Sequence, residues 1–331
     1  MGKISNIMNH YFSDNRRFAD LFNVVWFKKD VVTAEELTDI AEVYHEPEAE
    51  KVSSGIKSKR KERIRDVCKA LKSGQILRIL ALENMELVDY VAPFRCVQYD
   101  MMEYSRQIDT LRRKNFREKN LTTPSERICG LRQTDRLIPV YTLCLYHGAE
   151  RWDGPRSLRD MMEFSSDDDL FWKTFSDYPM HLYCLNEADN LEQFRTEVGI
   201  LFRALQFRKD RKGLKQLLQD NMEYRQVDAD TLEAMTVLLE LPSIWNEREK
   251  YLNLIKDDRE EFDMCQAVRE WAEEERNIGR TEGRREGRRQ GEEDKAFIIV
   301  KNLLHRGTSE EEIMLITECD REFVARVRST I

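Results

Sequence analysis

The chain has 331 residues, of which 41% are hydrophobic and 35% are charged, and its formal net charge is −8. This composition supports a sizeable core and excludes a disordered chain, and the net charge excludes nucleic-acid binding through overall positive charge. Seven widely spaced cysteines without a C-x-x-C pair exclude a zinc ribbon or a disulfide scaffold and indicate buried, reduced thiols. No apolar run is long enough for a membrane span or a signal peptide, so we expect a cytoplasmic protein without a membrane partner.

The first third of the chain predicts a helix and a β-hairpin. Apolar residues at helical spacing predict a helix over 15–27, and the polar stretch 45–61 is typical of a loop. Two apolar runs of strand length, 63–71 and 75–84, are joined by a segment that contains Gly74. This pattern predicts a hairpin, in which glycine supplies the turn.

The turn fixes an expected register for this hairpin. If Ser73 and Gly74 form a two-residue loop, Lys72 lies opposite Gln75 and Asp66 lies opposite Ala81. Glu83 is then a diagonal neighbour of Asp66 on the same face, because side chains alternate along a strand. Position 85 shares that face. The two acids are either solvated edge charges with Lys69 and Arg78 as partners, or ligands of a metal ion.

The middle of the chain alternates between helices and strands. We expect a helix over 95–119, strands over 136–148 and 180–187, and a helix after Gly154 that Ser157 and Asp160 cap. Residues 191–251 have a helical pattern throughout. Together these elements predict an α/β fold with a mixed sheet flanked by helices and a helical C-terminal extension.

The C-terminal part begins with a glycine- and arginine-rich stretch. Residues 276–291 contain six Arg and two Glu, a net charge of +4, and glycine recurs at 279, 283, 287 and 291. The stretch is a basic tether that follows DNA phosphates, a solvated helix with i,i+4 charge pairs, or a helix with a small-residue stripe for close approach. Three short helices should follow, with Gly307 ending the first and Ser309 and Asp320 capping the others. They resemble a helix-turn-helix in outline and equally suit homo-oligomer formation.

These patterns divide the chain into four segments. We expect the α/β core over 1–190, a helical region packed on it over 191–262, a charged linker or long helix over 263–295, and a small helical module over 296–331.

Four parts of the chain resemble the Rpn family of recombination-promoting nucleases, also described as transposases. They are FADLFN (18–23), Asp66 with Glu83-Asn84, PFRCVQYDMMEY (93–104) and RLIPVYTLCLYHGAERWDGPRSLRDMM (136–162). The resemblance covers about residues 10–265. It implies a PD-(D/E)XK restriction-endonuclease-like core, in which Asp66 and Glu83 are the two acids that bind Mg²⁺ or Mn²⁺. Carboxylate oxygens are the hard ligands that Mg²⁺ prefers.

The third position of the motif departs from the family. It is lysine in the superfamily and commonly glutamine in this family, but here it is Met85. A methionine has no proton to give and only a weak acceptor sulfur, so it cannot orient a water or contact a phosphate.

Further residues have open roles. Asp20 is either an additional metal ligand or a solvated helix position, and Arg95 either contacts DNA or is structural. Arg156 could meet an anion, or its segment could be a turn chosen for backbone geometry. Five arginines of the basic stretch are candidate DNA contacts: Arg280, Arg284, Arg285, Arg288 and Arg289.

The resemblance therefore predicts a metal-dependent DNA endonuclease that hydrolyses phosphodiesters in recombination or in mobile elements. The alternative is a degenerate family member that does not cleave and instead regulates by binding DNA or a protein. Met85 is the reason to keep that alternative.

Overall fold

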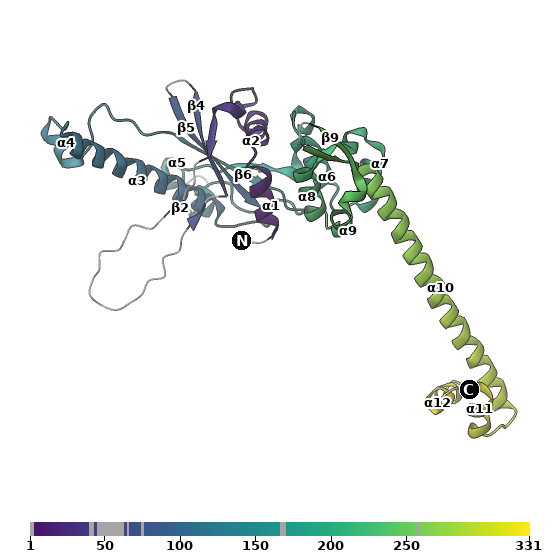
Figure 1. Ribbon diagram of the computed structural model, residues 1–331. Helices are drawn as coiled ribbons and strands as arrows, with labels where there is room; N and C mark the ends of the chain where they lie inside the picture. The colour runs from purple at the N-terminus through teal and green to yellow at the C-terminus, as the bar shows by residue number, and fades with distance from the viewer. Residues whose placement is uncertain are drawn as a thin grey trace. The chain divides into compact units, whose positions relative to one another are not determined.

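The computed structural model describes residues 3–39, 43–44, 63–64, 66–73, 76–165, 170–256 and 259–331 (Figure 1). The predicted loop 45–61 and the predicted turn residue Gly74 lie outside these ranges. The chain forms two compact units, Met1–Val268 and Arg269–Ile331. The expected core and the helical region after it therefore belong to the same unit.

The first unit is built on a mixed five-stranded sheet in the order β1-β4-β5-β6-β7. Strand β5 pairs with β4 in the antiparallel direction, whereas β5, β6 and β7 run parallel. The strands are β1 (Leu37–Asp39), β4 (Val67–Ser73), β5 (Ile76–Met85), β6 (Val140–Tyr146) and β7 (His181–Cys184). The predicted α/β fold with a mixed sheet is confirmed, and β6 lies inside the sheet between β5 and β7, although β5 is the central strand.

The register of the β4–β5 hairpin differs from the expected one by two residues. Ser73 pairs with Ile76 and Val67 pairs with Leu82, whereas the prediction set Lys72 opposite Gln75. Ser73 and Ile76 are both part of the ladder, so Ser73 is not the loop residue that was predicted. A shift of two preserves the faces, because the side-chain period is two. Asp66 lies just outside the ladder, one position before the Val67–Leu82 pair.

Helices cover both faces of the sheet. Helix α3 (Ala92–Glu118) lies against β6 on one face, where Thr142 donates to Asp100 over 2.7 Å. The other face packs against α1 (Lys3–Tyr11), α2 (Asn15–Leu21) and a π-helical continuation, Phe22–Phe27. Lys69 of β4 is fully buried there and donates to the Ser13 carbonyl and to Asn15, each over 2.7 Å. The predicted helix over 15–27 is thus confirmed, with a change of helix type at Phe22.

Short elements accompany the five-stranded sheet. They are a second two-stranded pair, β2 (Val43–Tyr44) with β3 (Arg63–Ile64), and helices α4 (Pro124–Cys129) and α5 (Leu170–Thr174). Ser157 and Asp160 exchange the predicted capping hydrogen bonds of 2.9 and 3.3 Å. The helix expected after them is only a 3₁₀ turn, Arg159–Met161.

The region after residue 190 contains a small sheet that the sequence did not reveal. Its helices are α6 (Val198–Gln206), α7 (Arg211–Asp220), α8 (Ala229–Leu238) and α9 (Pro242–Asn246). Strands β8 (Val227–Asp228), β9 (Leu252–Lys256) and β10 (Arg259–Phe262) form a sheet in the order β8-β10-β9. Three of the four residues of β10 are charged, so its strand character has no apolar pattern to signal it.

The second unit, from Arg269 onward, contains most of one long helix and a compact end. Helix α10 (Met264–His305) runs without a break through all four glycines of the basic stretch, so the predicted solvated helix is the form observed. Gly307 has a φ of 77°, and the side chains of Ser309 and Asp320 cap α11 (Glu310–Thr317) and α12 (Arg321–Arg328), as predicted. The core of the second unit contains Val300, Ile313, Val324 and Val327.

None of the helices in the described ranges is long and apolar enough to cross a membrane.

Candidate functional site

The two acids lie at the end of the β4–β5 hairpin, beside the parallel part of the sheet. Glu83 is in β5, is 3% exposed, and pairs in register with Cys144 of β6. Asp66 comes directly before β4, and its Oδ2 accepts a 2.7 Å hydrogen bond from the backbone N–H of Asn84. The Asp66 side chain thereby serves as the hydrogen-bond acceptor of the Asn84 N–H, one residue before β4 begins. This contact fixes its carboxylate next to the residue that follows Glu83.

Asn9 of α1 is a further support of Asp66. Its Nδ2 donates to Asp66 Oδ1 over 3.1 Å, and its Oδ1 accepts from Asn84 Nδ2 over 2.8 Å. Helix α1 and strand β5 therefore hold the Asp66 carboxylate from two sides. A carboxylate fixed by donors in this way is oriented before any ligand arrives.

Burial raises the pKa of Asp66 above its usual range. The hydrogen bonds from Asn84 and Asn9 lower that pKa, and so does the positive charge of Arg95, but burial prevails. The carboxylate is thus short of compensating positive charge. A cation beside it would stabilise its ionised form.

Arg95, in the first turn of α3, acts on both acids. Burial lowers the pKa of its guanidinium, but the carboxylates of Asp89 and Glu83 raise it, and the net shift is upward. Its Nη1 donates to Asp89 Oδ2 over 2.5 Å. Because the charge of Arg95 also lowers the pKa of Asp66, the three charged groups form one electrostatic cluster. The sequence left open whether Arg95 contacts DNA or is structural. The structure adds a specific contact for Arg95, with Asp89.

Met85 is packed into the core at the third position of the motif. It is 4% exposed and belongs to an apolar cluster with Ala92, Cys96, Cys144, Tyr146, Trp152, Met180 and Cys184. The Sγ atoms of Cys96 and Cys144 are 3.2 Å apart in this cluster, between α3 and β6. Met85 is therefore a core residue, and the third position of the motif has no amine or amide group.

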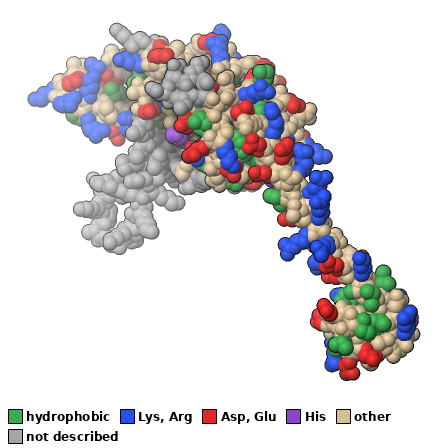
Figure 2. All heavy atoms as spheres, turned by 45° about the vertical axis from the view of Figure 1, so that its right-hand side comes forward, with side chains coloured by type: hydrophobic (Ala, Val, Ile, Leu, Met, Phe, Trp, Pro, Cys, Tyr) green, Lys and Arg blue, Asp and Glu red, His purple; other side chains and the backbone are tan. Residues whose placement is uncertain are grey.

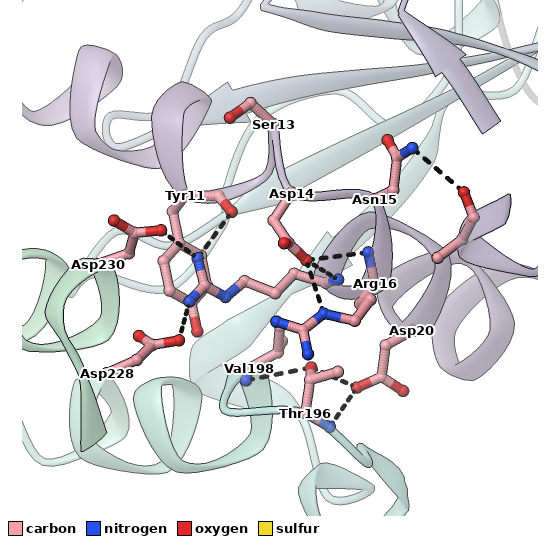
Figure 3. A network of polar contacts seen from close by, with 12 residues as sticks. Tyr11, Ser13, Asp14, Asn15, Arg16, Asp20, Thr196, Val198, Asp228 and Asp230 are labelled. Atoms are coloured by element: carbon pink, nitrogen blue, oxygen red, sulfur yellow. Dashed lines mark hydrogen bonds and ion pairs between the residues drawn. The ribbon is translucent and has the colours of Figure 1, made fainter. Parts of the chain in front are cut away.

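Asp20 serves the backbone of a distant segment. Its Oδ2 accepts hydrogen bonds from the backbone N–H of Arg195 and Thr196 over 3.0 and 2.8 Å, and from Thr196 Oγ1 over 2.6 Å. Figure 3 shows Asp20 beside Thr196, ahead of Val198, where α6 begins. Asp20 therefore binds the backbone that leads into α6. Neither sequence interpretation, a metal ligand or a solvated helix position, included this role.

The arginines proposed from the basic stretch all lie on α10, in the second unit. Arg288 pairs with Glu292, and Arg289 pairs with Glu286 and Glu293. Figure 2 shows blue Lys and Arg side chains along this helix. Exposed pairs of this kind contribute little stability and leave the arginines available to anions.

Sequence reasoning missed Asn9 and Asp89 and did not assign a role to Asn84. Asn84 follows Glu83 directly, so the Glu-Asn dipeptide was its only signal. Asn9 is 57 residues away from Asp66 along the chain, and no local pattern connects them. Among the described residues, no group of three or more His, Cys, Asp or Glu is arranged to hold a metal ion. In that part of the chain, the donor set at this site is therefore the carboxylate pair.

Comparisons with protein-family models, with curated proteins and with solved structures found no match.

Proposed function

We propose that this protein is a metal-dependent DNA endonuclease of the Rpn type, with a PD-(D/E)XK-like core. The observation that carries the proposal is the placement of Asp66 on the backbone N–H of Asn84, next to Glu83, with the charge of Arg95 acting on both acids. A mixed five-stranded sheet flanked by helices supports the same proposal. Its substrate is the DNA phosphodiester, and recombination or mobile elements are its proposed setting.

The donor set fits Mg²⁺ or Mn²⁺ as cofactor. Both ligands are carboxylates, and the partly buried Asp66 is only partly compensated by Arg95, so a divalent cation would supply further positive charge. When bound, such an ion would polarise the phosphate and lower the pKa of a water molecule.

The chain's own residues have distinct tasks in this proposal. Asp66 and Glu83 hold the ion, while Asn9 and the Asn84 N–H keep Asp66 in place. Arg95 partly neutralises the two acids, so that a phosphate can approach them. Met85 gives no proton and orients no water, which we expect to lower the rate by about 10²–10⁴-fold relative to a lysine or glutamine.

Nicking of supercoiled plasmid in Mg²⁺ or Mn²⁺ tests the proposal. We expect slow nicking by the wild type, and Asp66→Asn and Glu83→Gln to lower its rate at least about 100-fold, because each removes a ligand charge. Glu103→Gln is the matched control. Glu103 is a carboxylate buried at least as deeply as Glu83, but it bonds to Arg106 and Gln107 on α3, and its loss should spare nicking. Nicking that survives both acid substitutions contradicts the site.

A second measurement tests the cofactor without requiring activity. Because burial raises the folded-state pKa of Asp66, the wild type should lose stability relative to Asp66→Asn as pH rises from 3.8 through that higher pKa. Mg²⁺ should restore the loss at neutral pH and raise Tm, by about 2–4 °C per kcal/mol of binding. Thermal unfolding with and without Mg²⁺ measures both effects. An equal Mg²⁺ effect on the wild type, Asp66→Asn and Glu83→Gln would exclude this pair as the binding site.

Met85 also favours a second candidate, a non-cleaving regulator that binds DNA or a protein. Its side chain is committed to the apolar cluster, so the motif lacks its third functional group. The same two experiments separate the candidates. A Tm that rises with Mg²⁺ through Asp66 and Glu83, without any nicking, identifies the regulator.

A further inference from the structure

The segment between β5 and α3 exposes apolar side chains next to the candidate site. Four residues form what we name the 87–94 shelf: Leu87 at 79%, Tyr90 at 60%, Val91 at 53% and Phe94 at 47% exposure. They fall within eight residues of one another and are interleaved with Asp89, which Arg95 binds. An exposed apolar group of this density on a folded protein marks an interaction surface.

Tyr90 also forms the edge of a hollow. The hollow has a volume of about 640 Å³ and is lined by Tyr90, Asp153, Gly154, Pro155, Arg156, Asp160 and Met161. The hydroxyl of Tyr90 donates to Asp153 Oδ1 over 3.2 Å, which holds the ring in place. A Cβ at Gly154 would approach Val88 Cγ1 to 2.9 Å, so the loop packs closely on the shelf. The Tyr90 ring therefore lines the hollow and is held there through its hydroxyl.

Two arginines flank the shelf. Arg156 lines the hollow with its side chain about half exposed, and its Nη2 lies 3.7 Å from Glu187. Arg95 follows Phe94 directly and acts on both candidate ligand acids. Exposed aromatic rings between cations are the usual elements of a surface for unpaired nucleotides, because rings stack on bases and guanidinium groups bind phosphates.

The shelf favours an unpaired base over a duplex. Tyr90 and Phe94 offer ring faces, and a base inside a duplex has both of its faces stacked already. The hollow also contains the carboxylates of Asp153 and Asp160, which repel a continuous phosphate backbone but accept hydrogen bonds from amino groups on a base. We infer that the 87–94 shelf binds an unpaired nucleotide, with the base on Tyr90 and a phosphate at Arg156.

This inference rests on the proposed nuclease function for its biological meaning, and it names the substrate class as DNA with a single-stranded segment. The aromatic shelf would hold unpaired bases while the adjacent strand enters the acid pair. The binding step itself requires no metal and no cleavage.

Fluorescence anisotropy tests the inference with a labelled 20-nucleotide DNA strand and the same strand in a duplex, both in EDTA. We expect the single strand to bind more tightly than the duplex. Tyr90→Ala should weaken single-strand binding roughly 5- to 150-fold, the range for one stacked base, and Tyr90→Phe should retain most of it. Arg156→Gln should weaken it as well and reduce its salt dependence.

The control is Phe116→Ala, which removes another exposed aromatic side chain, 63% exposed, near the other end of α3. It should leave binding unchanged, and the Tm of each variant verifies folding. The proposal is overturned if the duplex binds as tightly as the single strand, or if neither DNA binds. It is also overturned if Tyr90→Ala leaves the Kd unchanged. Loss of plasmid nicking in the acid variants bears on the nuclease proposal alone, because anisotropy in EDTA records binding only.

Discussion

Replacing Arg17 by methionine should lower the free energy of unfolding by about 3 kcal/mol, whereas the same change at Arg16 should be nearly neutral. Arg17 is 2% exposed and binds two carboxylates that are more than 200 residues away in sequence. Its Nη1 donates to Asp230 over 2.9 Å, and its Nη2 donates to Asp228. Figure 3 shows Asp228 and Asp230 close to Tyr11.

The cost arises from what the substitution leaves behind. The side chain of Asp228 is only 17% exposed, and it would lose its cation while it still caps α8 through Thr231. An uncompensated buried charge is more destabilising than the pair itself is stabilising. The guanidinium also lies 4.2 Å from the centre of the Tyr11 ring, so a cation–π contact is lost too.

Urea unfolding measures the prediction, and Arg16→Met is the matched control. Arg16 is the neighbouring residue, its side chain is 49% exposed, and its closest carboxylate contact is 3.7 Å, to Asp14. The midpoint of the Arg17 variant should fall with an unchanged slope, and added salt should not reproduce the effect, because buried pairs are weakly screened. Similar midpoints for the two variants would show that this contact does not join α2 to α8 in solution.

The same contact illustrates what a sequence can predict and what it cannot. Alternation and apolar runs identified the hairpin, β6 and β7, because those strands carry their own periodic signal. The glycine and capping residues likewise located α11 and α12. Arg17 with Asp228, and Asn9 with Asp66, join segments whose local patterns are ordinary, so only the fold brings them together.

The candidate site was predictable to the same degree. Its two acids follow from the hairpin pattern and the family resemblance, and a register error of two residues still left both acids at the same end of the hairpin. Asp20 illustrates the limit, because a carboxylate on a helix can serve a metal or a backbone equally well. Its partners at 195 and 196 decide in favour of the backbone contact, and they lie at least 175 residues away. The charged strand β10 was missed because it carries no apolar alternation.

Replacing the four α10 glycines together by alanine should slow trypsin cleavage after Arg280–Arg289 on the order of 100-fold. A Cβ added at Gly279, Gly283, Gly287 or Gly291 would meet no atom within 4 Å, and none of the four has a positive φ, so alanine fits each position without strain. Each replacement favours the helix by about 1 kcal/mol, and residues 273–295 are exposed throughout, so helix propensity governs their opening. Trypsin acts on the opened form, so its rate follows that equilibrium.

Gly307→Ala is the opposing control for this prediction. Gly307 also has open space around an added Cβ, but its φ is 77°, so alanine there should destabilise the end of α10 by about 1–2 kcal/mol.

Light scattering on the four-alanine variant addresses the predicted homo-oligomer at the same time. If the glycine stripe lets a second helix approach closely, added methyl groups separate the helices and lower the mass. An unchanged mass with slower cleavage assigns the glycines to helix flexibility alone. Unchanged cleavage would mean that something other than helix propensity protects this stretch.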